Sequence, residues 1–127
     1  MAETIGFELV SPERLLVAKP VEMVVVPGTE GDFGVMPRHA PMIATVRPGV
    51  IAIFEGGKVS ERIFVAGGFA EVTGERCTVL AERAVPVADI DRAAVERKLK
   101  EDREAADAAE VEVGEAMLAA IDHPSYH

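Results

Sequence analysis

A sharp change in composition near residue 87 constrains the fold of this chain more than any other feature. Ten of its 11 glycines, seven of its 8 prolines and all 5 phenylalanines precede residue 87. The segment from Asp89 to Ile121 contains one glycine and no proline. Glycine and proline punctuate strands and turns, and their absence permits continuous helix. We therefore expect two regions, a β domain over residues 1–87 and a helical hairpin over residues 88–127.

The first region has the pattern of short strands joined by tight turns. Apolar and polar residues alternate in runs such as Ile5, Phe7 and Leu9, as they do in half-buried strands. Gly56 and Gly57 mark the clearest β-hairpin. The other turn-forming pairs are Ser11–Pro12, Pro27–Gly28, Pro48–Gly49, Gly67–Gly68 and Thr73–Gly74. Many short antiparallel strands predict a β-sandwich or flattened barrel.

The second region is rich in Ala, Glu, Lys and Arg, which are strong helix formers. Asp89 or Asp91 caps a first helix that runs to about Ala106. A capping-box-like pair, Asp107 and Glu110, then begins a second helix. The apolar stripe predicted for the second helix is Val111, Gly114, Leu118 and Ile121, flanked by Met117. Because such faces bury little area, the hairpin either detaches readily from the β domain or permanently caps a sheet edge.

Composition and motifs argue against several functions. The net charge of -9 disfavours binding to nucleic acid or to an anionic lipid surface. No run approaches the roughly 18–20 apolar residues that span a membrane. The only cysteine, Cys77, excludes an internal disulfide, and His39, His123 and His127 lack the spacing of a helical metal site. No serine lies in the context of a catalytic triad. We therefore predict no enzymatic activity, no metal and no cofactor.

The segment EGDFGVMPRHAPM at positions 30–42 is the most distinctive single motif. Its glycines and prolines predict an exposed, structured loop, and its apolar residues need a surface to cover. One interpretation is a loop that contacts a partner. The other is an Ω-like connection that packs on its own domain.

Together with two further segments, this motif resembles the epsilon subunits of bacterial F-type ATP synthases. The further segments are ATVRPGVIAIFEGG from position 44 and VAGGFAEVTGERCTVLAERA from position 65. The resemblance covers nearly the whole chain. It implies a flattened β-sandwich of about ten strands followed by two helices, in a subunit that catalyses nothing itself.

The resemblance also implies partners and a location. Such subunits lie in the central stalk, bind the gamma subunit and the ring of c subunits, and rotate with them at the cytoplasmic face of the bacterial inner membrane. The hairpin of some members also reaches the alpha and beta subunits. The residues expected to contact gamma and the c-ring are Glu30, Gly31, Asp32, Phe33, Gly34 and His39.

Two departures from the family pattern concern the helices. Some relatives bind ATP through a motif of the form I/L-D-x-x-R-A, but here Arg92 directly follows Ile90 and Asp91, so the nucleotide site is degenerate. Asp91 then acts as a helix cap. No Lys or Arg follows Arg103, which disfavours inhibition by a basic hairpin against an acidic partner.

Three functions therefore compete. The first is a non-catalytic rotor subunit that links gamma to the c-ring and couples proton flow to ATP synthesis. The second is a regulatory subunit whose hairpin inhibits ATP hydrolysis. The third is a stand-alone β-sandwich that binds a small ligand, against which the absence of Trp and the single Tyr both argue.

Overall fold

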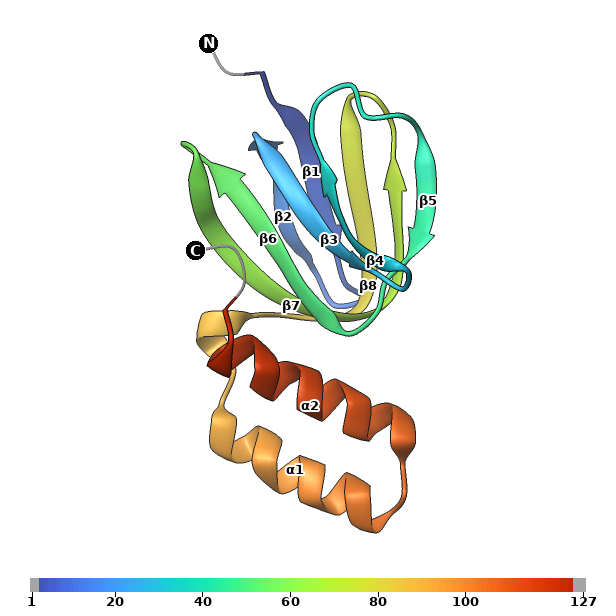
Figure 1. Cartoon of the computed structure of the whole chain (residues 1–127), viewed down its shortest axis with the longest axis vertical. Helices are drawn as coiled ribbons and strands as arrows, with labels where there is room; N and C mark the ends of the chain where they lie inside the picture. Colours follow the sequence, from blue (N-terminus) through green and yellow to red (C-terminus); the bar gives the residue numbers. More distant parts are fainter. Residues whose placement is uncertain (1–2, 125–127) are drawn as a thin grey trace.

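The computed structural model describes residues 3–124, so Ser125, Tyr126 and His127 lie outside the described residues. It contains a β-sandwich and, below it in Figure 1, a helical hairpin. The strands are β1 (Ile5–Val10), β2 (Leu15–Val21), β3 (Met23–Gly28), β4 (Gly31–Val35), β5 (Met42–Thr45), β6 (Gly49–Glu55), β7 (Lys58–Val72) and β8 (Arg76–Pro86). A 3-10 turn, η1 (Val87–Asp89), leads to the helices α1 (Arg92–Glu104) and α2 (Ala108–Asp122).

The strands form one folded sheet that encloses the main core. Their order is β2-β1-β8-β7-β6-β3-β4, and β5 pairs with β7. The β1–β8 pair is parallel and the other pairs are antiparallel. Alternate residues of each strand point inward, so Ile5, Phe7 and Leu9 of β1 are completely buried. The predicted mainly β fold with two C-terminal helices is confirmed, with eight strands in the described part of the chain instead of about ten.

One reason for the lower count is that Gly67 and Gly68 do not form a turn. They lie inside β7, which continues through them with φ values of 74° and 101°. At this point the strand exchanges its faces: Val65 and Ala70 are buried in the main core, although strict alternation would place them on opposite sides. A Cβ on Gly68 would lie 1.9 Å from the carbonyl oxygen of Leu80. Glycine is therefore required here for a bend within one strand. The sequence had predicted a turn between two strands at this point.

The β6–β7 hairpin is confirmed as predicted. Glu55 pairs with Lys58, which leaves Gly56 and Gly57 as the two loop residues. Both have positive φ, at 64° and 76°. Two left-handed residues match the twist of an antiparallel hairpin, which explains the pair of glycines.

Both helices begin at the predicted aspartates. The side chain of Asp91 accepts a hydrogen bond from the backbone nitrogen of Ala94, and that of Asp107 accepts one from Glu110, each at 3.2 Å. The expected capping box is only half formed, however. The carboxylate of Glu110 contacts Arg83 on β8 and Lys98 on α1. The stronger electrostatic pull of two cations explains why it does not turn back to the helix start.

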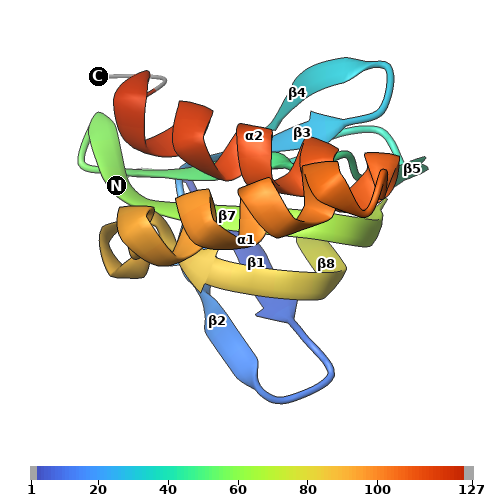
Figure 2. The ribbon, with the colours of Figure 1, turned by 90° about the horizontal axis from the view of Figure 1, so that it is seen from below.

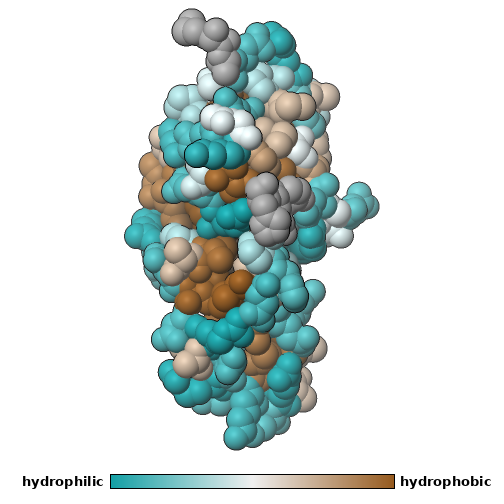
Figure 3. All heavy atoms as spheres, turned by 60° about the vertical axis from the view of Figure 1, so that its left-hand side comes forward, coloured by the Kyte–Doolittle hydropathy of each residue, from teal (hydrophilic) through white to brown (hydrophobic). Residues whose placement is uncertain are grey.

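The hairpin packs on the sandwich mainly through α2, which lies between the strands and α1 in Figure 1. Seen from below, both helices lie across the end of the sandwich (Figure 2). A second, smaller core joins Phe64 and Ala66 of β7 to Ala120 of α2. Of the apolar face predicted for α2, Met117 packs against the second core and Gly114 lies against Leu99 of α1. The other residues of α2 in the second core are Val113, Ala116 and Ala120, which the predicted stripe did not include. Figure 3 shows hydrophobic surface where the sandwich meets the hairpin. The contact is thin, since Leu99 and Ala120 are the only buried residues of the two helices.

Candidate functional site

The first half of the predicted loop is a strand. Gly31–Val35 forms β4, which runs antiparallel to β3, and Gly28 pairs with Gly31 across the turn. Val35 is completely buried, and Phe33 packs against the main core. The period-two pattern of these two apolar residues explains why the glycines do not break the strand. The loop proper is confined to residues 36–41.

Arg47 fixes the β3–β4 hairpin to the rest of the sandwich. Its guanidinium donates to the carbonyl oxygen of Gly28 at 2.6 Å and pairs with Asp32 at 2.5 Å. Beside it, the hydroxyls of Thr29 and Thr45 lie 2.7 Å apart and join the turn to β5. Asp32 thus has an intramolecular role in addition to any contact with a partner. One guanidinium nitrogen of Arg47 donates to its carboxylate, and the other donates to the Gly28 carbonyl oxygen.

The tip of this hairpin and β5 enclose an open groove of about 500 Å³. Glu30 lies exposed at the turn, and Gly31 beside it has a φ of 129°. The lining is mixed, with the ring of Phe33 and the side chains of Met42 and Ile43 next to the backbone of the turn. An apolar floor with a carboxylate at its rim is suited to a protein segment that carries a cation.

His39 lies at the other end of β4, apart from Glu30. Its Nδ1 is 2.7 Å from the carbonyl oxygen of Ala40. The neighbouring Arg38 donates its backbone N–H to Gly74 O at 2.7 Å and its guanidinium to both carboxylate oxygens of Glu3. The structure therefore brings Glu30, Gly31, Asp32, Phe33 and Gly34 together along β4 and places His39 beside the β7–β8 turn.

An exposed apolar row crosses the outer face of the sandwich and was not predicted. Phe69 pairs with Leu80, Leu80 with Val10, and Val10 with Leu15, so these side chains follow one line over β7, β8, β1 and the start of β2. Thr45 is the residue of β5 opposite Phe69, and Ile43 lies two residues from Thr45 on the same face of β5. We call Phe69, Leu80, Val10, Leu15 and Ile43 the apolar row. The exposed fractions are 71% for Ile43, 55% for Leu15, 41% for Phe69 and 40% for Leu80. Large exposed apolar residues that adjoin one another mark a surface for association.

The three residues of the degenerate nucleotide motif do not converge on a ligand site. Asp91 caps α1, Ile90 packs in the second core, and Arg92 pairs with Asp122 and Glu96. The Asp122 carboxylate raises the pKa of the Arg92 guanidinium. Arg92 therefore joins the start of α1 to the end of α2 through an ion pair. The sequence did not indicate this role.

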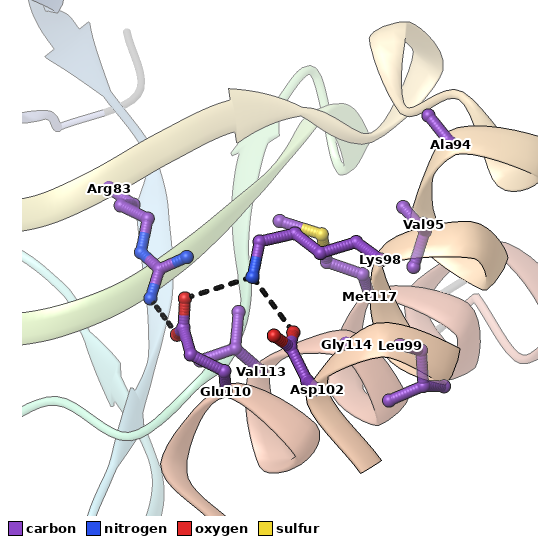
Figure 4. Close-up of a pocket in the computed structure, with 10 residues that line it drawn as sticks. All are labelled: Arg83, Ala94, Val95, Lys98, Leu99, Asp102, Glu110, Val113, Gly114 and Met117. Atoms are coloured by element: carbon purple, nitrogen blue, oxygen red, sulfur yellow. Dashed lines mark hydrogen bonds and ion pairs between the residues drawn. The ribbon is translucent and has the colours of Figure 1, made fainter. Parts of the chain in front are cut away.

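A cavity of about 180 Å³ lies between the two helices and β8 (Figure 4). Its walls are mostly apolar, with Val95, Leu99 and Met117 among them. The charged groups around it neutralise one another, because Arg83 and Lys98 face the carboxylates of Glu110 and Asp102. An anionic ligand would meet these carboxylates, so the cavity does not suit a nucleotide.

No other group in the described residues has the features of a catalytic or metal centre. The Cys77 thiol is buried, which raises its pKa to about 12 and keeps it protonated at neutral pH. Residues 3–124 contain no group of three or more His, Cys, Asp and Glu side chains that could hold a metal ion. Within the same residues, neither helix is long and apolar enough to cross a membrane.

Comparison with known proteins identifies the family. A family model described as ATP synthase, Delta/Epsilon chain, beta-sandwich domain matches residues 4–87. The ATP synthase epsilon chain of Rhodospirillum rubrum is 60% identical over 131 residues and covers 94% of this chain and 98% of its own. The ATP synthase epsilon chain of Paramagnetospirillum magneticum is 56% identical over 132 residues, with 95% and 99% coverage.

Solved structures agree with this result. A chain in the OSCP/F1/c-ring assembly of the Euglena gracilis mitochondrial ATP synthase superposes with a TM-score of 0.81 at 25% identity, covering 93% of this chain and 81% of that one. A chain in the central stalk/c-ring of the Tetrahymena thermophila enzyme shares the fold, with a TM-score of 0.56 at 15% identity and coverage of 73% and 70%. The sequence and structure together establish that the chain belongs to the ATP synthase delta/epsilon chain family.

Proposed function

We propose that this chain is a non-catalytic subunit of the central stalk of a proton-translocating F1Fo ATP synthase, where it links the gamma subunit to the c-ring. Its relatives are ATP synthase epsilon chains, and its structural neighbours come from assemblies that include the c-ring. As a rotor subunit it transmits rotation and so couples proton translocation to ATP synthesis. It is peripheral to the membrane, at the cytoplasmic face of the bacterial inner membrane.

The apolar row is the observation that carries this proposal. Four of its five side chains are at least 40% exposed, and together they lie on adjacent strands. Adjacent strands are about 4.8 Å apart, so the line from Phe69 to Leu15 extends for about 14 Å. Subunit interfaces have an apolar centre within a polar rim, and the row supplies such a centre. We assign this face to the gamma subunit.

We assign the tip of the β3–β4 hairpin to the c-ring. Glu30, Gly31, Asp32 and Phe33 form one edge of the groove beside β5, and Gly34 follows them on β4. The bond between Asp32 and Arg47 keeps the hairpin rigid, which reduces the entropy lost on docking. His39, at the far end of β4, then lies nearer the gamma subunit than the ring.

The test is recovery of the complex from native membranes. We expect the wild-type chain to copurify in mild detergent with the gamma subunit and the c-ring, as identified by mass spectrometry. Leu80→Glu places a charge in the middle of the apolar row and should lower recovery of gamma by at least tenfold, because the charge would lose its hydration in the interface. Ala109→Glu adds the same charge on an exposed position of α2 and should leave recovery unchanged.

Equal recovery of gamma with both variants would contradict the assignment of the row. Recovery of the wild-type chain alone, as a monomer, would contradict the rotor function itself and return the ligand-binding sandwich to consideration. Circular dichroism of the purified variants separates lost docking from lost folding.

We further propose that residues 1–87 and 88–127 are separate domains. The main core is built from residues of the strands and of the short β5–β6 connection, and the helices contribute to the second core only. A chain truncated after residue 87 should therefore retain cooperative unfolding, measured by denaturant titration. Loss of the cooperative transition in the truncated chain would show that the two parts form one domain.

A further inference from the structure

We propose that Glu110 is an electrostatic latch that holds the helical hairpin on the β-sandwich without a bound ligand. This inference concerns the isolated chain and does not depend on the rotor role. It rests on where one carboxylate lies, how little apolar area otherwise joins the two parts, and which charges surround it.

Glu110 is the point where three elements meet (Figure 4). One of its carboxylate oxygens accepts a hydrogen bond from the guanidinium of Arg83 on β8. The other accepts one from Lys98 on α1 at 3.3 Å. Lys98 also pairs with Asp102, one turn further along α1, at 2.8 Å. A single side chain of α2 is therefore bonded both to the sandwich and to the other helix.

The apolar contact beneath the hairpin is too thin to make these bonds redundant. Ala120 is the only buried residue of α2, and its side chain is a single methyl group. Met117 and Val113 contribute only partly buried surface. Burial of apolar area stabilises by roughly 25 cal/mol per Å², so most of this contact comes from Phe64 of β7 and little from the alanines of α2. The Arg83–Glu110 pair adds a directional contact between α2 and the sheet to this apolar one.

The surroundings of Glu110 favour its charged form. The hydrogen bond from Arg83 is the main cause that lowers the pKa of the Glu110 carboxylate, and the hydrogen bond from Lys98 lowers it further. The Glu110 side chain is 25% exposed and that of Asp102 is 16% exposed, compared with 46% for Arg83 and 56% for Lys98. The carboxylates therefore lie at the inner side of the network, and the cations cover them from solvent. Salt screens such half-exposed pairs.

The latch also gives a role to the glutamate at the third position of α2, which does not complete a capping box. Glu110 stands at the third position of α2, where a capping box would turn its side chain back to Asp107. Its carboxylate instead reaches across to β8, and Asp107 donates its backbone N–H to the carbonyl of Asp102. The cavity of about 180 Å³ lies next to this network, and Arg83, Lys98 and Glu110 are among the residues that line it.

The experiment measures amide hydrogen exchange of the full chain as salt increases from about 0.05 M to 0.5 M, a range that shortens the screening length severalfold. We expect exchange in α1 and α2 to rise by about three- to tenfold, while the core strands keep their protection. The variant Glu110→Gln should exchange as fast at low salt as the wild-type hairpin does at high salt. Its exchange should respond less to salt than that of the wild type, because only the pairs that do not involve Glu110 remain to be screened.

Two controls separate the latch from effects on the helix itself. Glu112→Gln makes the same chemical change at an exposed position of the same helix and should leave hairpin exchange within about twofold of wild type. Because Glu110 also lies near the positive end of the α2 dipole, the second control is a double-mutant cycle with Arg83→Gln. The latch predicts that the double variant exchanges no faster than Glu110→Gln alone.

Two results would overturn the proposal. In the first, Glu110→Gln and Glu112→Gln give the same exchange rates. In the second, the effects of Arg83→Gln and Glu110→Gln multiply as independent changes, which would show that the two side chains are not coupled.

Discussion

The sandwich and the hairpin of this chain are held together by different forces. The sandwich encloses a core of branched and aromatic side chains, among them Phe7, Ile51 and Ile53, which are completely buried. The hairpin buries only Leu99 and Ala120, and ion pairs surround it. Salt does not screen apolar burial, whereas it weakens half-exposed charge pairs. One part therefore provides a permanent scaffold, and the other provides an element whose attachment depends on conditions.

The largest effect should come from truncating the sandwich core. Phe7→Ala removes a fully buried ring and should lower the free energy of unfolding by about 3–5 kcal/mol, measured by urea denaturation. Phe69→Ala is the matched control, since the same ring is 41% exposed on the outer face of the sheet. It should lower the free energy of unfolding by less than about 1.5 kcal/mol. Equal losses in the two variants would refute the proposed division between core and docking face.

A smaller and more local effect is expected in the hairpin. Leu99→Ala empties the space against Gly114, where the methyl group of Leu99 would lie 3.0 Å from an added Cβ. We expect local opening of the two helices to become easier by about 2–3 kcal/mol, measured by hydrogen exchange. The urea midpoint of the sandwich should hardly move. A loss of sandwich stability equal to the local effect would mean that the two parts unfold together.

Acid should loosen the hairpin before it affects the sandwich core. The pKa of Glu110 is lower in the folded chain than in the unfolded one, where a glutamate has a value of about 4.3. Its stabilising effect is therefore complete above that value and is lost as the pH falls through the lower, folded value. Exchange of the helices, measured by NMR between about pH 6 and pH 3, should reveal this loss. Glu110→Gln should remove this pH-dependent rise in exchange. A variant with the same pH profile as the wild type would show that Glu110 does not cause the rise.

The smallest effect is expected from a charge network within the sandwich. Lys19 on β2 pairs with Glu55 at 2.8 Å and with Glu61 at 3.4 Å, and Ser60 donates a further hydrogen bond to Glu55. These groups are more than a third exposed, and a large core lies beneath them. Lys19→Gln should therefore change the free energy of unfolding by no more than about 1 kcal/mol. A larger loss would show that charges matter as much in the sandwich as in the hairpin.

Local signals in the sequence were sufficient to predict most of the elements. Gly56 and Gly57 specify a two-residue hairpin loop, and Asp91 and Asp107 specify the helix starts, because each acts through neighbours a few residues away. The sheet order, the closing of the sandwich and the bend at Gly67 depend on contacts between distant strands. Gly68, for example, is required by the carbonyl of Leu80, whose position no local pattern reveals.

The candidate site was predicted only in part for a related reason. The segment from Glu30 to Gly34 was noticed because its composition is unusual. Most of it lies in β4, an edge strand of the sheet, and not in a loop. The apolar row was not predicted because the sequence does not show which face of a strand points to the core. Phe69 and Leu80 therefore resemble core residues in the sequence. Glu110 was predicted to cap its own helix, and the competing attraction to Arg83 became visible only when β8 was placed beside α2.

The long strand β7 gives the subunit a mechanical property. Its 15 residues, at about 3.3 Å each, amount to a contour of about 50 Å. Phe64 and Ala66, in the middle of the strand, support α2, and Phe69, three residues further on, belongs to the apolar row. A force applied at the row therefore reaches the base of the hairpin along one hydrogen-bonded backbone and not through flexible side chains. The glycine bend lies between the two attachment points, so torsional compliance along this path is concentrated at Gly67 and Gly68.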